Sequence, residues 1–265
     1  MEKVTSKDGT RIAYEKSGSG PTVILVAGAL TDRKEMRPLA EALSSDLTVI
    51  SYDRRSRGDS EDTQTVFPES ADREIEDIQA LAEAAGGPVS LYGHSSGASL
   101  ALEAAAVIGP EKLILHEPPY EPGEPAEGEP DPSDYNRDLR TCFRNGDDEG
   151  AVELFLRTVG MPEEMIEGMK SGEDWPEWVA KGRSLAYDSA AVGDANGGRI
   201  PRDLLPKVTC PTLTLAGSET FPFMIEVAET LAEELTGGLC LVVQGADHEA
   251  GPDVVAPPVK AFLAG

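Results

Sequence analysis

The sequence predicts an α/β fold: a mostly parallel sheet flanked by helices, with a helical segment inserted after the sixth core strand. Short apolar runs alternate with helical patterns along the chain, as expected when helices cover both faces of a parallel sheet. The motif Gly-His-Ser-Ser-Gly at residues 93–97 lies between one such run, residues 89–92, and a helical pattern of small residues, residues 98–102. The length of 265 residues favours one large domain with an insertion over two independent domains.

The core begins with a strand at residues 11–15, which we expect at the edge of the sheet. Residues 17–21 are rich in serine and glycine but precede a strand, which favours a hairpin turn over a phosphate-binding loop. Further strands are predicted at residues 22–26, 47–51, 89–92, 113–116, 211–217 and 239–243, and core helices at residues 36–43, 74–84, 98–102 and 254–263.

The composition of the chain changes after residue 117. Residues 118–132 are rich in proline, glutamate and glycine, which indicates an extended connection. Helical patterns follow at residues 137–144, 151–159, 163–170 and 175–185. We therefore expect an inserted helical unit between the sixth and seventh core strands.

Ser95 is the candidate nucleophile. It lies on a turn between a strand and a helix, and the flanking glycines let the backbone turn sharply without side-chain clashes. Such a turn presents the hydroxyl away from the chain, where it can attack a carbonyl. The short pattern alone occurs by chance, so the prediction depends on the strand before it and the helix after it. The alternative is a tight turn with a satisfied hydroxyl.

His248 is the candidate base for this serine. An imidazole within hydrogen-bond reach activates a serine hydroxyl at neutral pH. Of the other two histidines, His94 adjoins the serine with its ring expected to point away, and His116 ends an apolar run. His248 follows the last predicted strand, which fits the chain order serine, acid, histidine of one hydrolase class. The alternative is an ordinary surface histidine.

With these motifs the chain resembles the α/β-hydrolase superfamily. Residues 22–29 are similar to the strand and loop that supply one oxyanion-hole amide in that family, and residues 53–60 are similar to its D-x-R-G-x-G-x-S loop. Ser56 stands where the family usually has a glycine, which concerns the backbone of that loop rather than the chemistry. The resemblance implies an oxyanion hole made by the main-chain N–H groups of Ala29 and Ser96.

The resemblance also assigns the inserted helices to a cap. In the family such a segment lies over the nucleophile and shapes the substrate pocket. We expect residues 1–117 and 200–265 to form the α/β-hydrolase core and residues 118–199 to form the helical cap or lid.

The acid that orients His248 is the less regular member of the triad. Thr220 occupies the position that aligns with the aspartate of many family members. Glu117 directly follows the strand at residues 113–116, and it resembles the strand-end glutamate that some haloalkane dehalogenases and the zearalenone lactonases use as triad acid. Ligand sites of parallel sheets gather at the carboxyl ends of strands, which favours Glu117. Glu219 is the alternative.

Four large apolar side chains are candidates for the substrate pocket: Met165, Trp175 and Trp178 in the cap, and Phe221 after a core strand. Flexible thioethers and large rings suit an adaptable apolar pocket, and they equally suit the core of a small helical unit. No charged recognition group stands out. A substrate with a mainly apolar acyl or ring portion is therefore expected.

Charge and cysteine content exclude several classes of partner. The formal net charge of −25 disfavours nucleic acid and anionic membranes, because both need a basic surface. The three cysteines form no C-x-x-C pair, which favours free thiols in a reducing compartment over disulfides or a zinc site. With no signal-peptide pattern and no membrane-length apolar run, we expect a cytoplasmic protein that acts on a small-molecule substrate without metal or organic cofactor.

The sequence therefore predicts a serine hydrolase that cleaves a small, largely apolar carboxylic ester or lactone through an acyl-enzyme on Ser95. Enzymes of this fold that form an alkyl-enzyme use an aspartate at that position, whereas a serine suits acyl transfer. Two other functions stay open: a non-hydrolytic enzyme of the same fold, such as a cofactor-free perhydrolase, a lyase or a cyclase, and a ligand-binding protein with weak or no hydrolysis.

Overall fold

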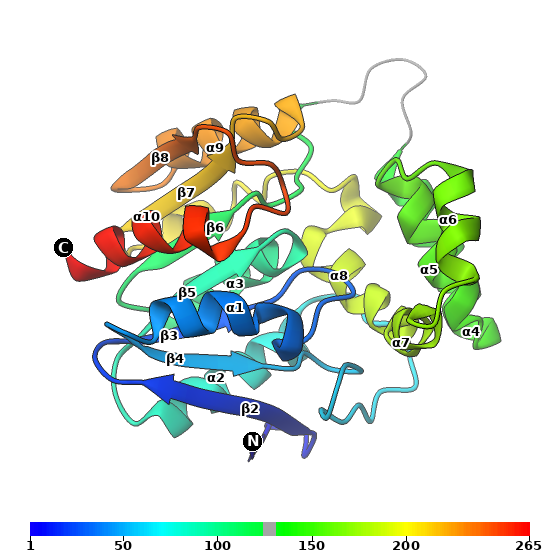
Figure 1. Ribbon diagram of the computed structural model, residues 1–265, viewed down its shortest axis with the longest axis horizontal. Coiled ribbons are helices and arrows are strands. Elements are labelled where there is room, and N and C mark those ends of the chain that lie inside the picture. Colours follow the sequence, from blue (N-terminus) through cyan, green and yellow to red (C-terminus); the bar gives the residue numbers. More distant parts are fainter. Residues whose placement is uncertain (124–130) are drawn as a thin grey trace.

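The structure is a computed structural model that describes residues 1–123 and 131–265 (Figure 1). In these residues eight strands form one sheet in the order β1-β2-β4-β3-β5-β6-β7-β8. The strands are β1 (Glu2–Thr5), β2 (Arg11–Gly18), β3 (Thr22–Val26), β4 (Thr48–Tyr52), β5 (Val89–His94), β6 (Leu113–His116), β7 (Thr212–Gly217) and β8 (Gly238–Val243). β1 and β2 run antiparallel to their neighbours, and the six strands β3 to β8 are parallel to one another.

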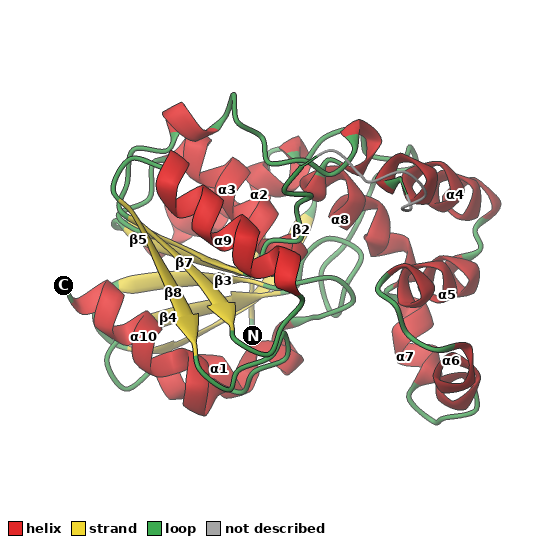
Figure 2. Cartoon of the chain, turned by 90° about the horizontal axis from the view of Figure 1, so that it is seen from above, coloured by secondary structure: helices red, strands yellow, loops and turns green. Residues whose placement is uncertain are grey.

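Helices cover both faces of the sheet, with α1 and α10 on one face and α2, α3 and α9 on the other (Figure 2). The helices are α1 (Arg33–Leu43), α2 (Asp72–Ala85), α3 (Ser96–Ile108), α4 (Pro132–Asn145), α5 (Asp148–Thr158), α6 (Glu163–Lys170), α7 (Trp175–Ala180), α8 (Leu185–Val192), α9 (Pro222–Glu234) and α10 (Pro252–Ala264), with short 3-10 helices η1 (Gly182–Ser184), η2 (Asp194–Asn196) and η3 (Leu205–Lys207). The predicted α/β fold with a mostly parallel sheet is confirmed.

Two apolar cores lie on the two faces of the sheet. Along β3, Ile24 and Val26 join the core under α2, α3 and α9, while Val23 and Leu25 join the core under α1 and α10. Alternate side chains of a strand point to opposite faces, so a strand covered on both faces must be apolar throughout. The continuous apolar runs of the sequence follow from this double coverage.

The helices between β6 and β7, α4 to α8, are called the helical insertion below. α4, α5, α6 and α7 lie beyond the carboxyl ends of the parallel strands (Figure 2), and α8 packs against α3. The insertion has its own apolar cluster, which includes Val152, Ile166 and Trp175 and takes in Leu30 from the loop after β3. A single bridge joins Glu121 to Arg199 where the chain leaves and re-enters the core. The division at residues 118–199 stays a prediction.

Three local predictions were wrong. The hairpin predicted at residues 17–21 does not form, because β2 pairs with β4 and not with β3, the strand that follows it in the chain. The strand predicted at residues 11–15 is not at the edge, because the short strand β1, with its largely exposed residues, pairs beyond it. The helix predicted at residues 175–185 is divided into α7, η1 and α8. A Cβ at Gly182 of η1 would lie 2.2 Å from the carbonyl oxygen of Asp148, so only glycine lets η1 pack this closely on α5. Part of the connection predicted at residues 118–132 lies outside the described residues.

None of the helices in the described part of the chain is both long enough and apolar enough to cross a bilayer.

Candidate active site

Ser95 lies in a sharp turn between β5 and α3. Its backbone has φ 54° and ψ −130°, which L-residues rarely adopt. A Cβ at Gly93 would lie 2.3 Å from the carbonyl oxygen of Gly97, and one at Gly97 would lie 2.3 Å from the carbonyl oxygen of Val26. Only glycine fits at either flanking position, so the sequence around the serine is dictated by the tightness of the turn.

Ser95 is one of four described residues with strained backbone at the carboxyl ends of the parallel strands. Among the described residues, the non-glycine positions with positive φ are Leu30 (54°), Ser56 (60°), Ser95 (54°) and Glu117 (50°). They follow β3, β4, β5 and β6 in turn, at the carboxyl ends of four adjacent strands. A left-handed backbone costs a non-glycine residue about 1–2 kcal/mol, and such strain clusters at functional sites. The backbone strain therefore identifies the carboxyl ends of these strands as a candidate functional site, independently of any sequence motif.

Glu117 and His248 are joined by a short hydrogen bond. Nδ1 of His248 donates to Oε2 of Glu117 at 2.5 Å, and the Glu117 side chain is fully buried while that of His248 is 21% exposed. The carboxylate also accepts from the N–H of Gly217 at 2.7 Å and from the hydroxyl of Thr220 at 2.8 Å. Burial opposes ionisation, but these three hydrogen bonds outweigh it and lower the pKa of Glu117.

The tautomer of His248 follows from this contact. A charged carboxylate at Nδ1 keeps the proton on that nitrogen, which leaves Nε2 free to accept a proton from a serine hydroxyl. The ring of His248 lies close to the nucleophile turn, because its centroid is 4.7 Å from the ring of His94, the residue before Ser95. Base and nucleophile are thus carried by neighbouring loops.

In the described part of the chain, Glu219, the alternative acid, has an exposed side chain without a hydrogen bond or ion pair to His248. Its backbone N–H donates to the carbonyl oxygen of Ala246 at 2.8 Å. Thr220, at the position that aligns with an aspartate in many relatives, directs its hydroxyl to Glu117 instead. The geometry favours Glu117 over Glu219 as the partner of His248.

The two predicted oxyanion donors belong to segments that meet at Ser95. A Cβ at Gly28 would lie 3.1 Å from Cβ of Ser95, so the loop after β3 abuts the nucleophile turn, and Ala29 is the next residue of that loop. Ser96 is the first residue of α3, where backbone N–H groups have no partner within the helix. The binding of an oxyanion between these two amides stays a prediction.

Residues 23–258 match the model of the alpha/beta hydrolase family. The chain belongs to this family. An alpha/beta hydrolase from Sphaerobacter thermophilus is 37% identical, with a TM-score of 0.86 over 99% of this chain and 100% of that one. A thermophilic esterase from Thermogutta terrifontis, solved with malate bound, is 25% identical, with a TM-score of 0.70 over 99% of this chain and 97% of that one.

A curated relative matches over a shorter stretch. The uncharacterized hydrolase YraK of Bacillus subtilis is 32% identical over 114 residues. These residues are 42% of this chain and 42% of that protein, so the match spans less than half of either.

The loop after β4 departs from the usual family pattern at Ser56. Its φ of 60° explains why the family usually has glycine at this position. The Ser56 hydroxyl donates to Oδ2 of Asp62 at 2.5 Å, a contact that glycine could not make. In this alpha/beta hydrolase, Ser56 thus holds a left-handed backbone position with its side chain fixed by Asp62.

The ring of His94 contacts those of both His248 and His116, tilted against each. Nε2 of His94 donates to the carbonyl oxygen of His248 at 2.9 Å, and the rings of His94 and His116 lie 4.8 Å apart. Nδ1 of His116 hydrogen-bonds to the hydroxyl of Tyr92 at 2.8 Å. Burial lowers the pKa of His116 to about 4 and that of His94 well below its usual value, so both rings are neutral near pH 7. Through its hydrogen bond to the backbone of His248, His94 stabilises the position of the loop that carries the proposed base.

The four pocket candidates are not gathered in one place. Trp175 is buried in the apolar cluster of the insertion and donates from Nε1 to Glu149 at 2.9 Å, and Trp178 packs at the edge of that cluster. Met165 and Phe221 are exposed. Their contact with substrate stays a prediction.

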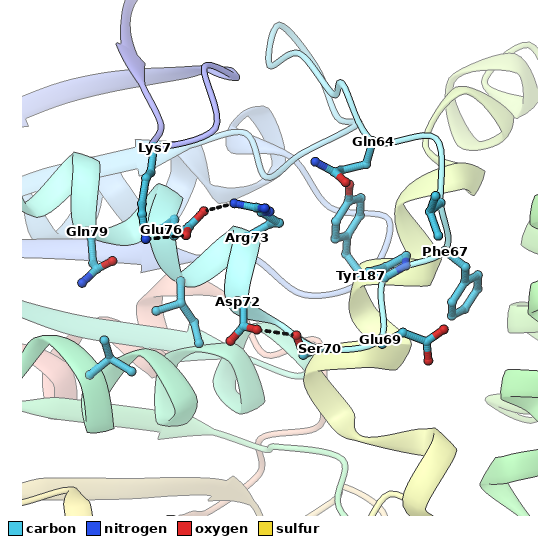
Figure 3. A pocket seen from close by; sticks show the side chains of 14 residues that line it. Lys7, Gln64, Phe67, Glu69, Ser70, Asp72, Arg73, Glu76, Gln79 and Tyr187 are labelled. Carbon is cyan, nitrogen blue, oxygen red and sulfur yellow. Dashed lines mark hydrogen bonds and ion pairs between the residues drawn. The ribbon is translucent and has the colours of Figure 1, made fainter.

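A hollow of about 630 Å³ lies elsewhere, between α2, residues 64–70 and Tyr187 (Figure 3). Its cations are paired, since Lys7 and Arg73 both contact the carboxylate of Glu76, at 3.1 and 2.7 Å. None of the predicted catalytic residues lines it. This hollow is therefore separate from the Ser95 site.

Sequence reasoning missed a cluster of buried charges behind the oxyanion loop. Arg54 binds Glu74 at 2.7 and 2.6 Å, and both Arg54 and Arg57 bind Asp188 of α8 at 2.6 Å. The sequence carried one signal: three arginines within residues 53–60 of a strongly acidic chain. It carried no comparable signal for Asp188, a single acid in a run of small and apolar residues.

Proposed function

We propose that the protein is a serine hydrolase that cleaves a small, largely apolar carboxylic ester or lactone through an acyl-enzyme on Ser95. The observation that carries this proposal is the 2.5 Å hydrogen bond between the buried Glu117 and His248, next to the strained turn that bears Ser95. Family membership supports hydrolysis, and the resemblance to the Thermogutta terrifontis esterase supports an ester-type substrate.

In the proposed mechanism, Oγ of Ser95 attacks the substrate carbonyl while Nε2 of His248 takes the hydroxyl proton. Glu117 holds the ring and stabilises the imidazolium that forms. The N–H groups of Ala29 and Ser96 bind the oxyanion of the tetrahedral intermediate. His248 then gives its proton to the leaving alkoxide, and water cleaves the acyl-enzyme by the same route.

The proposal also covers partner and location. The substrate is a small molecule, no nucleic acid or membrane surface takes part, and no cofactor is required. Cys142, Cys210 and Cys240 are free thiols, and Cys240 is exposed, which suits the reducing cytoplasm.

A fluorophosphonate probe followed by peptide mass spectrometry tests the proposal, because the probe reacts with an activated serine whatever the natural substrate is. We expect labelling confined to Ser95, and its loss in Ser95→Ala and His248→Ala. Panels of 4-nitrophenyl esters and of lactones would then define the substrate. A folded protein that is not labelled would contradict the proposal and favour a ligand-binding protein or a non-hydrolytic enzyme.

A further inference from the structure

The loop that carries one proposed oxyanion donor is held by arginine side chains through its carbonyl groups. Nη1 of Arg57 donates to the carbonyl oxygen of Gly28 at 2.5 Å and to that of Thr31 at 2.9 Å. Nη1 of Arg54 donates to the carbonyl oxygen of Ala27 at 3.0 Å. Both arginines are almost completely buried, with at most 1% of their surface exposed.

The contact between Arg57 and Gly28 fixes the direction of the oxyanion donor. The carbonyl of Gly28 and the N–H of Ala29 belong to one peptide group, which is planar and trans, so the two bonds point in opposite directions. Holding the Gly28 oxygen behind the loop therefore aims the Ala29 N–H away from Arg57. The strained backbone of Leu30, with φ 54°, fits a loop that its surroundings hold firmly.

The second proposed donor is held from the same place. The hydroxyl of Ser96 donates to Oδ1 of Asp188 at 2.7 Å and lies 3.4 Å from Nη1 of Arg54. Ser96 is 3% exposed, so water does not compete for this contact. Its side chain thus anchors the residue whose backbone N–H faces the substrate in the proposed mechanism.

Asp188 connects both anchors. Its Oδ1 accepts from Arg54 and Ser96, and its Oδ2 accepts from Arg57, at 2.6 to 2.7 Å. Burial opposes its ionisation, but the two arginines outweigh this and lower the pKa of Asp188. Asp188 comes from α8 of the helical insertion, whereas all its partners here belong to the core.

We propose that Asp188 is a positioning residue for the oxyanion hole, which aligns the Ala29 donor through Arg57 and the Ser96 donor through the Ser96 hydroxyl. This inference rests on the proposed function. It assigns the helical insertion a role in transition-state stabilisation through α8. A misplacement of catalytic groups by about 1 Å can cost on the order of a hundredfold in rate, so the loss of this contact has a measurable effect.

The test uses Asp188→Asn and Ser96→Ala, with Asp77→Asn as a matched control. Asp77 is equally buried and binds Arg55 at 2.6 and 2.7 Å, but this pair contacts neither the loop at residues 27–31 nor Ser96. Ser96→Ala removes only the hydroxyl and keeps the backbone N–H, so it stays informative even where Asp188→Asn does not fold. Circular dichroism and thermal unfolding of each variant check folding.

The readouts are hydrolysis of 4-nitrophenyl butyrate, the rate of fluorophosphonate labelling, and inhibition by a trifluoromethyl ketone that forms a tetrahedral adduct with the serine. For Asp188→Asn and Ser96→Ala we expect kcat, labelling rate and ketone affinity to fall roughly 10- to 100-fold, with KM within about threefold of wild type. For Asp77→Asn we expect lower thermal stability with unchanged kcat and ketone affinity.

Two results would overturn the inference, and they are distinguishable. A labelled wild-type protein whose Ser96→Ala and folded Asp188→Asn variants keep kcat and ketone affinity would overturn the positioning role alone. A folded wild-type protein that is neither labelled at Ser95 nor active would overturn the proposed function, and the inference with it.

Discussion

The two sides of the Ser95 turn are held by opposite kinds of chemistry. On the acid side, a single buried carboxylate, Glu117, is surrounded by an imidazole, a hydroxyl and a backbone N–H. On the oxyanion side, buried arginines are matched with buried carboxylates. Arginine stays charged at every accessible pH, whereas an imidazole changes charge near neutrality. The side that must move protons is built around an imidazole, and the side that must keep its geometry is built around arginines, which keep their charge.

The largest effect is expected from Glu117→Gln. An amide at this position cannot hold His248 in the required tautomer or stabilise its charged form, so kcat should fall roughly 10³- to 10⁴-fold while the protein stays folded. Steady-state kinetics beside Glu219→Gln, which alters an exposed carboxylate, provide the measurement and its control. Loss of activity in Glu219→Gln alone would show that the acid side has been assigned to the wrong residue.

The acid side should also carry a pH dependence of stability through His116. Its pKa is about 4 when folded and 6.5 when unfolded, so between these values the unfolded chain binds a proton that the folded protein does not. The free energy of unfolding is therefore unaffected by protonation of His116 above pH 6.5, and it falls by up to about 3 kcal/mol as the pH is lowered toward 4. Urea unfolding of wild type and His116→Gln from pH 4.5 to 8 measures this. Parallel stability curves for the two proteins would contradict it.

A smaller effect on the same side is expected from Thr220→Val, which removes one hydrogen bond to Glu117 and keeps the shape of the side chain. A hydrogen bond to a charged group contributes roughly 1.5–3 kcal/mol, so kcat should fall about 10- to 100-fold. Ser218→Ala is the control, because its hydroxyl accepts from the N–H of Gly245. Equal kcat values for Thr220→Val and wild type would show that the other two donors suffice.

The smallest effect concerns the oxyanion side. In Gly28→Ala the new Cβ would lie 3.1 Å from Cβ of Ser95 and 3.2 Å from the carbonyl oxygen of His94, which is tight enough to displace the loop by tenths of an ångström. We expect kcat to fall by about tenfold with little change in Tm. Gly87→Ala, where the added Cβ meets nothing within 4 Å, is the control. An unchanged kcat in Gly28→Ala would show that this loop tolerates movement.

The parallel core could be predicted from the sequence, and Glu117 could be named as the partner of His248 with Glu219 left as the alternative. Double coverage makes central strands apolar along their whole length, and residues directly after such strands must meet at one edge of the sheet. Ser95 and Glu117 directly follow β5 and β6, and His248 lies in the loop after β8, so their neighbourhood follows from local patterns.

The oxyanion-side cluster could not be found in this way. Asp188 binds Ser96, Arg54 and Arg57, which are separated from it by 92, 134 and 131 residues. α8 is also buried almost all round, so it lacks the polar face by which an amphipathic helix is recognised. Contacts between distant segments depend on the tertiary fold, and a single sequence contains no local pattern for them.

The bridge between Glu121 and Arg199 has an evolutionary consequence. Because the N–H of Glu121 also donates to the carbonyl oxygen of Gly198 at 2.8 Å, the helical insertion leaves and rejoins the core at adjacent points. A segment attached in this way can be exchanged between lineages, or in a chimera, without altering the sheet. Here the exchange is constrained: a replacement that brings no carboxylate to the position of Asp188 leaves Arg57 without a carboxylate partner. Changes confined to α4 to α7 would leave this charge pair intact, whereas the acid in α8 is needed to pair with Arg57 of the core.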